Sequence, residues 1–142
     1  MTAFVLDASV TAAWLLPDTA SEHTRRLYTL IRRDEVEPQA PNLWQWECSN
    51  LISSGVHSGR IPAASVEGLW SVLEAIRVEL HDLAPAQHKA VMDVALDTGL
   101  PTFDAAYLWL ARSLRLPLAT FDPQQIAAAQ RSGVPLLDLS SL

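Results

Sequence analysis

Residues 100–111, LPTFDAAYLWLA, are apolar or small at nearly every position and predict a helix that packs inside the protein. Asp104 is the exception, because it places a carboxylate in the first turn of this otherwise apolar helix. A charged side chain close to a core costs free energy unless it is paired or binds a ligand. The stretch therefore raises the question of which role keeps a carboxylate at that position.

The sequence on either side of this stretch alternates between short apolar runs and helical patterns. The apolar runs indicate strands or extended pieces at residues 3–6, 36–41, 78–83, 117–121 and 135–139. Helices are expected at residues 8–16, 20–34, 42–58, 62–76, 85–98, 102–115 and 123–132, with Pro17 ending the first of them. Strands that alternate with helices are typical of an α/β domain with a mostly parallel sheet.

The composition fits a single domain that covers residues 1–142. Hydrophobic residues make up 49% of the chain and charged residues 18%, which favours a packed core and excludes a disordered tail. No apolar run approaches the roughly 18–20 residues of a membrane span, and the N-terminus has no signal-peptide pattern. Because Cys48 is the only cysteine, an internal disulfide is excluded, and we expect a cytoplasmic protein with no membrane partner.

The charge balance is not that of an ordinary nucleic-acid-binding domain. The net charge is −6 and the isoelectric point is near 5.0, whereas most such domains are basic. Lys89 is the only lysine, so the positive charge is almost entirely arginine, which suits bidentate contacts with phosphate. The arginine pairs at 25–26 and 32–33 are candidates for such contacts, although solvated helix faces are the simpler explanation.

Four carboxylates stand out by their position in the expected fold. Asp7 follows the first strand and Asp122 follows the fourth, so both would face one crevice if these two strands are neighbours. Glu47 lies inside an apolar and aromatic helix, and Asp104 lies in the first turn of its own helix. Each acid alone also has a structural explanation as a helix cap, a partner of the helix dipole, a turn residue or part of an exposed stripe.

The four acids together favour a metal site. Their neighbours Leu6, Trp46, Phe103 and Phe121 indicate that the carboxylates lie close to the core. Two carboxylates about 4 Å apart repel each other by about 4 kcal/mol at an effective dielectric constant of about 20. A divalent cation removes this penalty, and hard oxygen ligands select Mg²⁺ or Mn²⁺ rather than zinc, which prefers cysteine and histidine.

Four segments, in this order, carry a resemblance to a known family: VLDASVTAAWLLPD, PNLWQWECSNLI, LPTFDAAYLWLA and LPLATFD. They resemble the PIN domain and, among PIN domains, the VapC-type toxins of bacterial toxin–antitoxin pairs. The resemblance extends over essentially the whole chain. It implies a three-layer α/β fold in which a parallel five-stranded sheet is flanked by helices.

The resemblance also assigns site residues. The acidic quartet of the family falls on Asp7, Glu47, Asp104 and Asp122. Ser9 and Thr120 match the small hydroxyl residues that often accompany the quartet, and we treat them as supporting candidates only. Pro101 departs from the family, because relatives often carry threonine there, but this change affects the helix cap and not a carboxylate.

The activity implied by the resemblance is that of a Mg²⁺-dependent endoribonuclease, with Mn²⁺ as a substitute, that acts as the toxin of a toxin–antitoxin pair. Metal-activated water would hydrolyse a phosphodiester bond of RNA. In this interpretation Asp7 and Asp104 anchor the main ion. Glu47 and Asp122 complete the site by coordination or by orienting bound water.

The implied partners are RNA, a cognate antitoxin and a second copy of the chain, in a homodimer or a larger toxin–antitoxin assembly. The antitoxin segment would lie in a groove near the active site, and an apolar first helix with Val10, Ala13 and Trp14 suits such a groove. We expect the five tryptophans mainly to pack in the core or at interfaces rather than to stack on bases.

Two other functions compete with this one. A PIN-type nuclease for RNA processing or decay, without a toxin role, fits the same residues. A receiver-type signalling module would need paired acids after the first strand and a lysine near the last strand. Here Ala8 follows Asp7, and the sole lysine lies in a helix, so this alternative is disfavoured.

Overall fold

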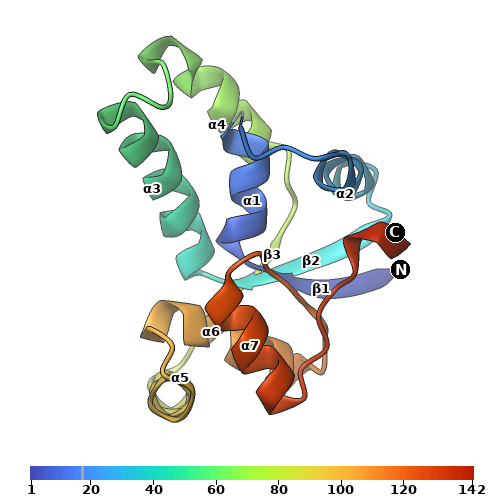
Figure 1. The fold of residues 1–142 in the computed structure, drawn as a ribbon, viewed down its shortest axis with the longest axis vertical. Helices are drawn as coiled ribbons and strands as arrows, with labels where there is room; N and C mark the ends of the chain where they lie inside the picture. Colours follow the sequence, from blue (N-terminus) through green and yellow to red (C-terminus); the bar gives the residue numbers. More distant parts are fainter. Residues whose placement is uncertain (17) are drawn as a thin grey trace.

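The structure is a computed structural model that describes residues 1–16 and 18–142, so the expected helix stop at Pro17 lies outside it. Strands and helices alternate along the chain, as expected (Figure 1). The strands are β1 (Thr2–Leu6), β2 (Val36–Pro41), β3 (Glu79–His81) and β4 (Leu118–Ala119). The α-helices are α1 (Ala8–Leu15), α2 (Glu22–Arg32), α3 (Leu43–His57), α4 (Val66–Glu74), α5 (Pro85–Thr98), α6 (Thr102–Leu114) and α7 (Pro123–Ser132), and the 3₁₀ helices are η1 (Ala63–Ser65) and η2 (Leu139–Ser141).

The sheet is parallel throughout, in the order β3-β2-β1-β4. Thr2 of β1 pairs with Val36 of β2, and Val5 of β1 pairs with Leu118 of β4. The first and fourth strands are therefore neighbours, which was the condition for Asp7 and Asp122 to share a crevice. The strand order reverses at β1, and open parallel sheets bind ligands at such a point.

The fifth strand expected at residues 135–139 is reduced to a single parallel bridge between Leu118 and Leu136. The Leu118 amide donates to the Pro135 carbonyl at 2.8 Å, and the Leu137 amide donates to the Leu118 carbonyl at 2.9 Å. The ladder stops there because Asp138 caps η2, with its Oδ1 accepting from the Ser140 amide at 3.0 Å. The expectation of a parallel sheet is confirmed, but the sheet has four strands in the described residues instead of five.

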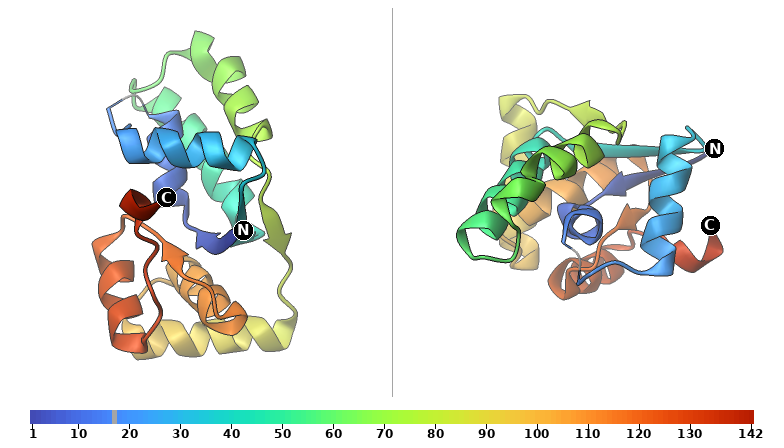
Figure 2. Two further views of the ribbon diagram at one scale, coloured as in Figure 1. Left: turned by 90° about the vertical axis from the view of Figure 1, so that its right-hand side faces the viewer. Right: turned by 90° about the horizontal axis from the view of Figure 1, so that it is seen from above.

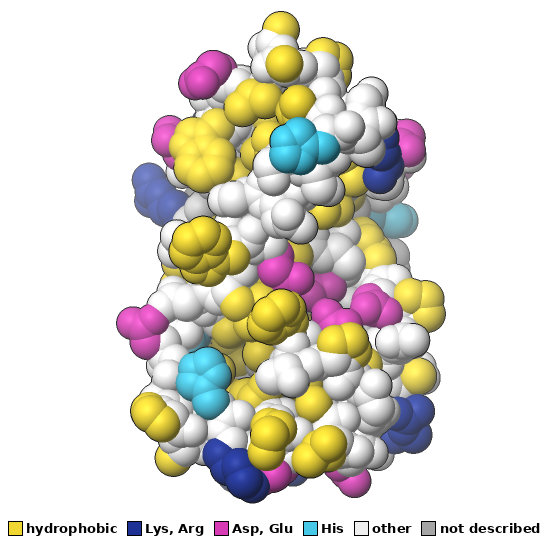
Figure 3. All heavy atoms as spheres, turned by 90° about the vertical axis from the view of Figure 1, so that its left-hand side faces the viewer, with side chains coloured by type: hydrophobic (Ala, Val, Ile, Leu, Met, Phe, Trp, Pro, Cys, Tyr) yellow, Lys and Arg dark blue, Asp and Glu magenta, His cyan; other side chains and the backbone are white. Residues whose placement is uncertain are grey.

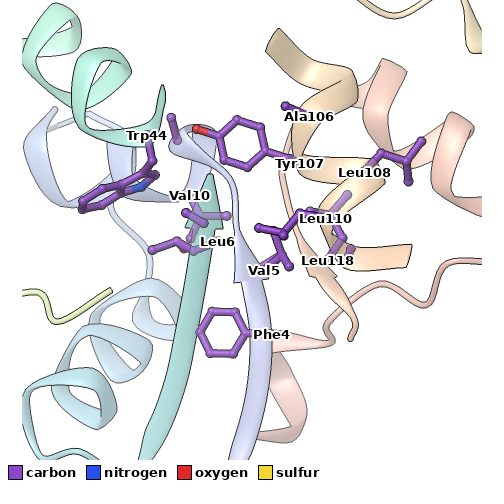
Figure 4. Packing of buried hydrophobic residues seen from close by; sticks show 14 of the residues in the cluster. Phe4, Val5, Leu6, Val10, Trp44, Ala106, Tyr107, Leu108, Leu110 and Leu118 are labelled. Atoms are coloured by element: carbon purple, nitrogen blue, oxygen red, sulfur yellow. The ribbon is translucent and has the colours of Figure 1, made fainter. Parts of the chain in front are cut away.

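The sheet lies between two layers of helices. Helices α1 to α4 cover one face, and α5, α6 and α7 cover the other (Figures 1 and 2). The core runs through both layers, because Phe4, Val5 and Leu6 of β1 are fully buried and pack with Tyr107 and Leu108 of α6 (Figure 4). In the described part of the chain, no helix is both long and apolar enough to cross a membrane.

The helix boundaries differ from the expected ones mainly at residues 62–76. There the chain first forms the short helix η1, with Pro62 at its N-cap, and α4 begins only at Val66. Pro62 donates no backbone hydrogen bond and takes an extended conformation, so it precedes the helix instead of forming its first turn. Helix α5 ends at Thr98, as predicted, and is capped by Gly99, whose φ of 79° is a left-handed conformation that glycine adopts without strain.

Candidate active site

Asp7 and Asp122 lie side by side in the fold because each follows one of two neighbouring strands. Asp7 comes directly after β1 and caps α1, and Asp122 caps α7 after the loop that follows β4. The Asp7 amide donates to the Ala119 carbonyl at 3.0 Å, which extends the β1–β4 pairing up to the site. Both acids therefore cap a helix, which was the alternative explanation for each of them in the sequence analysis. The pairing of β1 with β4 also brings them together at one edge of the sheet.

The Asp7 carboxylate is buried, at 4% relative exposure, and both of its oxygens accept hydrogen bonds. Oδ2 accepts from the Ser9 amide at 3.2 Å and from Thr120 Oγ1 at 3.0 Å. Oδ1 accepts from Gln125 Nε2 at 3.3 Å. These donors on both oxygens fix the orientation of the Asp7 side chain in its buried position.

The two hydroxyl residues, Ser9 and Thr120, connect the loop after β4 to the start of α1. Their side-chain oxygens are 3.3 Å apart. Ser9 Oγ accepts from the Phe121 amide at 2.9 Å, and Thr120 Oγ1 accepts from the Asp122 amide at 3.1 Å. The hydroxyls therefore hold the positions of Asp7 and Asp122 relative to each other, which suits the supporting role expected of them.

Glu47 of α3 reaches the site from the opposite helical layer to Asp104 of α6. Glu47 Oε1 accepts from Tyr107 Oη at 2.6 Å, and Tyr107 is fully buried one turn after Asp104 on the same helix. Figure 4 shows the Tyr107 hydroxyl directed away from α6, toward the helices on the other face of the sheet. This contact joins the two helical layers at the edge of the sheet where β1 ends.

The four carboxylates influence one another electrostatically. Burial raises the pKa of Glu47, the Tyr107 hydrogen bond lowers it, and the charges of Asp7 and Asp104 raise it. Burial also raises the pKa of Asp104, as do the charges of Asp122 and Asp7, and a hydrogen bond from Gln125 lowers it. Acidic side chains accordingly gather in the middle of one face of the molecule, whereas the lysine and arginine side chains on that face lie toward its edges (Figure 3).

The donor chemistry of this cluster fits a hard divalent cation. The candidate ligands are carboxylate oxygens, which Mg²⁺, Mn²⁺ and Ca²⁺ prefer. Burial, and after it the charges of the neighbouring acids, raise the pKa values of Glu47 and Asp104, and a bound cation would offset those charges. Within residues 1–16 and 18–142, no three Asp, Glu, His or Cys side chains are already arranged closely enough to hold an ion. Metal binding would therefore involve adjustment of the side chains.

The aromatic neighbours of the acids do not mark the core, so this part of the expectation was wrong. Trp46 is 79% exposed, Phe103 67% and Phe121 47%. The tryptophans also divide between core and surface: Trp44 is buried, with Nε1 donating to Thr11 Oγ1 at 3.0 Å, but Trp46 lies on the surface. Exposed aromatic side chains thus stand directly before three of the four acids in the sequence.

Two residues of the site, Tyr107 and Gln125, were not predicted from the sequence. Tyr107 could have been predicted as a neighbour of the site, because its hydroxyl-bearing side chain comes three residues after Asp104 and therefore lies on the same face of the helix. Gln125 is fully buried in α7, but it sits in DPQQIAAA beside another glutamine that is exposed, and nothing local distinguishes the two. The candidate arginines at 25–26 and 32–33 are all exposed, on α2 or at its C-cap.

Comparison with known proteins identifies the family of this chain. The family model of the PIN domain matches residues 4–131, and the chain belongs to the PIN domain family. Among its relatives, Ribonuclease VapC3 from Pyrobaculum aerophilum is 32% identical over 128 residues, which cover 84% of this chain and 89% of that protein. The resemblance to VapC-type PIN proteins is thereby confirmed.

Two solved structures share the fold. The crystal structure of PAE2754 from Pyrobaculum aerophilum matches with a TM-score of 0.69 and 24% identity, over 99% of this chain and 91% of that one. The crystal structure of FitAcB from Neisseria gonorrhoeae matches with a TM-score of 0.56 and 18% identity, over 98% of this chain and 99% of that one. At these identities the likeness concerns the fold alone.

Proposed function

We propose that this chain is a metal-dependent endoribonuclease that hydrolyses RNA phosphodiester bonds and acts as the toxin of a toxin–antitoxin pair. The observation that carries the proposal is the coupling of four carboxylates, from four different parts of the chain, at the edge of the sheet where β1 and β4 end. The relative named a ribonuclease, 32% identical over most of both chains, supports the RNA substrate.

In the proposed mechanism Asp7 and Asp104 anchor a Mg²⁺ ion, which Mn²⁺ can replace, and Glu47 and Asp122 complete its surroundings. A bound divalent cation supplies Lewis acidity, which lowers the pKa of water and offsets charge on the phosphate. Asp7 contributes a carboxylate whose orientation is set by donors on both oxygens. This orientation lowers the reorganisation that ligand binding would otherwise require.

Glu47 is held through one oxygen only. Burial raises the pKa of Tyr107, so its proton stays on Oη and is donated to Glu47 Oε1. Glu47 Oε2 accepts no hydrogen bond from any side chain or amide of the described residues. We assign this oxygen to contact with the divalent cation, or with a water molecule that the cation would bind. Asp122 Oδ1 accepts from the Gln124 amide at 2.8 Å, which orients this acid at the start of α7.

The exposed aromatic residues suggest how an acidic protein would hold RNA. Trp46, Phe103 and Phe121 directly precede Glu47, Asp104 and Asp122, and apolar side chains surround the acidic centre of this face (Figure 3). Stacking of unpaired bases on aromatic side chains contributes affinity without positive charge on the protein. We propose that single-stranded RNA is held mainly by such contacts.

A second apolar feature fits the proposed antitoxin. Ala13, Trp14 and Leu16 at the end of α1 line a groove together with Ile61 and Leu69. Val10, which the sequence analysis also assigned to such a groove, is instead fully buried in the core. We propose that an apolar antitoxin segment occupies this groove, that the toxin forms a homodimer or a larger assembly with it, and that both act in the cytoplasm.

The nuclease proposal is tested by incubating cellular RNA with the purified protein in Mg²⁺, in Mn²⁺ and in EDTA. We expect discrete fragments only with metal, and none from Asp7→Asn or Asp104→Asn. Asp93→Asn is the matched control, because Asp93 pairs with Lys89 on the exposed surface of α5 at 2.7 Å. Cleavage in EDTA, or full activity of both site variants, would contradict the proposal.

The toxin role needs a separate test. Induced expression in a bacterial host should arrest growth, and Asp104→Asn should not. If the enzyme cleaves RNA in the assay but the host grows normally, the role in RNA processing or decay is favoured instead.

A further inference from the structure

We infer that Gln125 is a positioning residue of the metal site, whose side-chain amide orients Asp7 in readiness for a divalent cation. This inference rests on the proposed function, because it assumes that Asp7 binds metal. Gln125 lies on α7, one turn after Asp122, and its side chain is completely buried.

The orientation of the Gln125 amide follows from its partner. Gln125 Nε2 donates to Asp7 Oδ1 at 3.3 Å, and a carboxylate oxygen is a hydrogen-bond acceptor. The end that faces Asp7 is therefore the NH₂ group. Because Ser9 and Thr120 donate to Oδ2, Gln125 is the side chain that restrains the other oxygen. Its removal would leave the carboxylate held on one side only.

The same amide also acts on Asp104. Hydrogen bonding from Gln125 lowers the pKa of Asp104, against burial and the charges of Asp122 and Asp7, which raise it. An NH₂ group carries two hydrogens and can serve two acceptors. The hydrogen bond to Asp7, at 3.3 Å, is the contact that the geometry defines, and Gln125 is the smallest of these influences on the pKa of Asp104.

Packing alone does not explain a glutamine at this position. Gln125 Oε1 is buried and, among the described residues, accepts no hydrogen bond, which costs free energy that an apolar side chain would not incur. Its neighbours on the buried face of α7, Ala128 and Ala129, are apolar. The other glutamines of this helix, Gln124 and Gln130, are exposed. The hydrogen bond from Gln125 Nε2 to Asp7 is therefore the best explanation for a buried glutamine whose Oε1 has no partner among the described residues.

The test uses Gln125→Met, which keeps the length of the side chain and removes the donors, and Gln130→Met as a control on the exposed face of the same helix. Calorimetric titration with Mn²⁺ and with Mg²⁺ measures metal affinity directly. We expect Gln125→Met to bind both ions about 10–100-fold more weakly, the range typical for loss of a group that orients a metal ligand. Gln130→Met should bind them as the wild type does.

A second set of measurements separates positioning from folding. The cleavage activity of Gln125→Met should recover as the Mg²⁺ concentration is raised, with an unchanged KM for RNA, because the defect lies in filling the site. A merely structural defect would lower activity at every metal concentration. Wild-type metal affinity in Gln125→Met would overturn the inference, and so would a loss of activity that excess metal does not restore.

A measurement on the wild type keeps the inference testable if the variant does not fold. Substoichiometric Mn²⁺ broadens the NMR signals of nearby protons, so the side-chain amide of Gln125 should broaden before that of Gln130. Equal behaviour of the two amides would overturn the inference. If the wild type binds neither ion, the proposed function itself fails, whereas normal metal binding by the wild type and by Gln125→Met alike removes only the role of Gln125.

Discussion

The Tyr107 hydroxyl donates to Glu47 Oε1 at 2.6 Å and so connects helix α6 to helix α3 across the edge of the sheet. Tyr107 is fully buried, and Glu47 is partly buried. The bond fixes the orientation of the Glu47 carboxylate. It also lowers the pKa of Glu47, whereas burial and the charges of Asp7 and Asp104 raise it. The geometry of this acid, and its readiness to ionise, therefore depend on a residue of the opposite helical layer.

Tyr107→Phe removes this hydrogen bond and leaves the packing of the ring. Hydrogen bonds to charged groups contribute about 1.5–3 kcal/mol, so we expect the free energy of unfolding at neutral pH to fall by about 1–3 kcal/mol, with lower RNA cleavage. Urea denaturation measures the change. Tyr28→Phe is the matched control, because the Tyr28 hydroxyl donates only a long bond of 3.4 Å to the Val72 carbonyl. An equal loss in both variants would contradict the special role of Tyr107.

The stability of the metal-free protein should depend on pH through Glu47 and Asp104. Burial raises both pKa values, so the folded state binds these two protons more tightly than the unfolded chain, whose carboxyl pKa values are about 4. Their contribution to the free energy of unfolding therefore decreases as the pH rises from about 4 through the raised pKa values. Thermal melts across this range, without metal, check the direction.

A divalent cation should reverse this trend. It binds ionised carboxylates, so the stabilisation by Mg²⁺ should grow over the same pH range. At a metal concentration about 100 times the Kd the gain is about 2.7 kcal/mol. Asp104→Asn should show a shallower pH dependence and a smaller response to Mg²⁺. An identical response to Mg²⁺ in wild type and variant would argue against Asp104 as a ligand.

Trp46→Ala tests the proposed stacking of RNA bases. Trp46 is 79% exposed, so its loss should change the free energy of unfolding by less than about 0.5 kcal/mol. Loss of a stacking partner weakens binding by about 1–3 kcal/mol per base, and we expect the KM for RNA to rise about tenfold. Leu96→Ala, at 77% exposure on α5, is the control. An unchanged KM with an altered oligomeric state would assign Trp46 to a protein interface.

Two glycines offer a matched pair for the packing of α3 against the turn that follows it. A Cβ added at Gly55 would lie 2.8 Å from Ile61 Cγ1, whereas one added at Gly68 of α4 would meet nothing within 4 Å. We expect Gly55→Ala to lower the free energy of unfolding by about 1–3 kcal/mol. Gly68→Ala should raise it by about 0.5–1 kcal/mol, because alanine favours helix. Urea denaturation compares the two, and equal effects would contradict the close approach of Ile61 to Gly55.

Most of the secondary structure could be predicted from local patterns, because hydrophobic periodicity and helix caps act within a few residues. Helices α5 and α7 have the expected bounds, 85–98 and 123–132; each begins at a proline, Pro85 or Pro123, and is followed by a glycine cap, Gly99 or Gly133. The extent of the sheet could not be predicted in this way. The run at 135–139 has the composition of a strand, but the N-cap made by Asp138 competes with the sheet and ends the pairing after Leu136.

The sequence by itself determined the alternation of strands and helices, the parallel class of the sheet and the positions of the acids at or near the ends of elements. These depend on interactions between near neighbours in the chain. Only the tertiary structure decided that β1 lies beside β4, that Tyr107 reaches Glu47 and that one glutamine of α7 turns inward to Asp7. Such contacts join residues far apart in the chain, and their energies depend on burial and distance, which local sequence patterns do not encode.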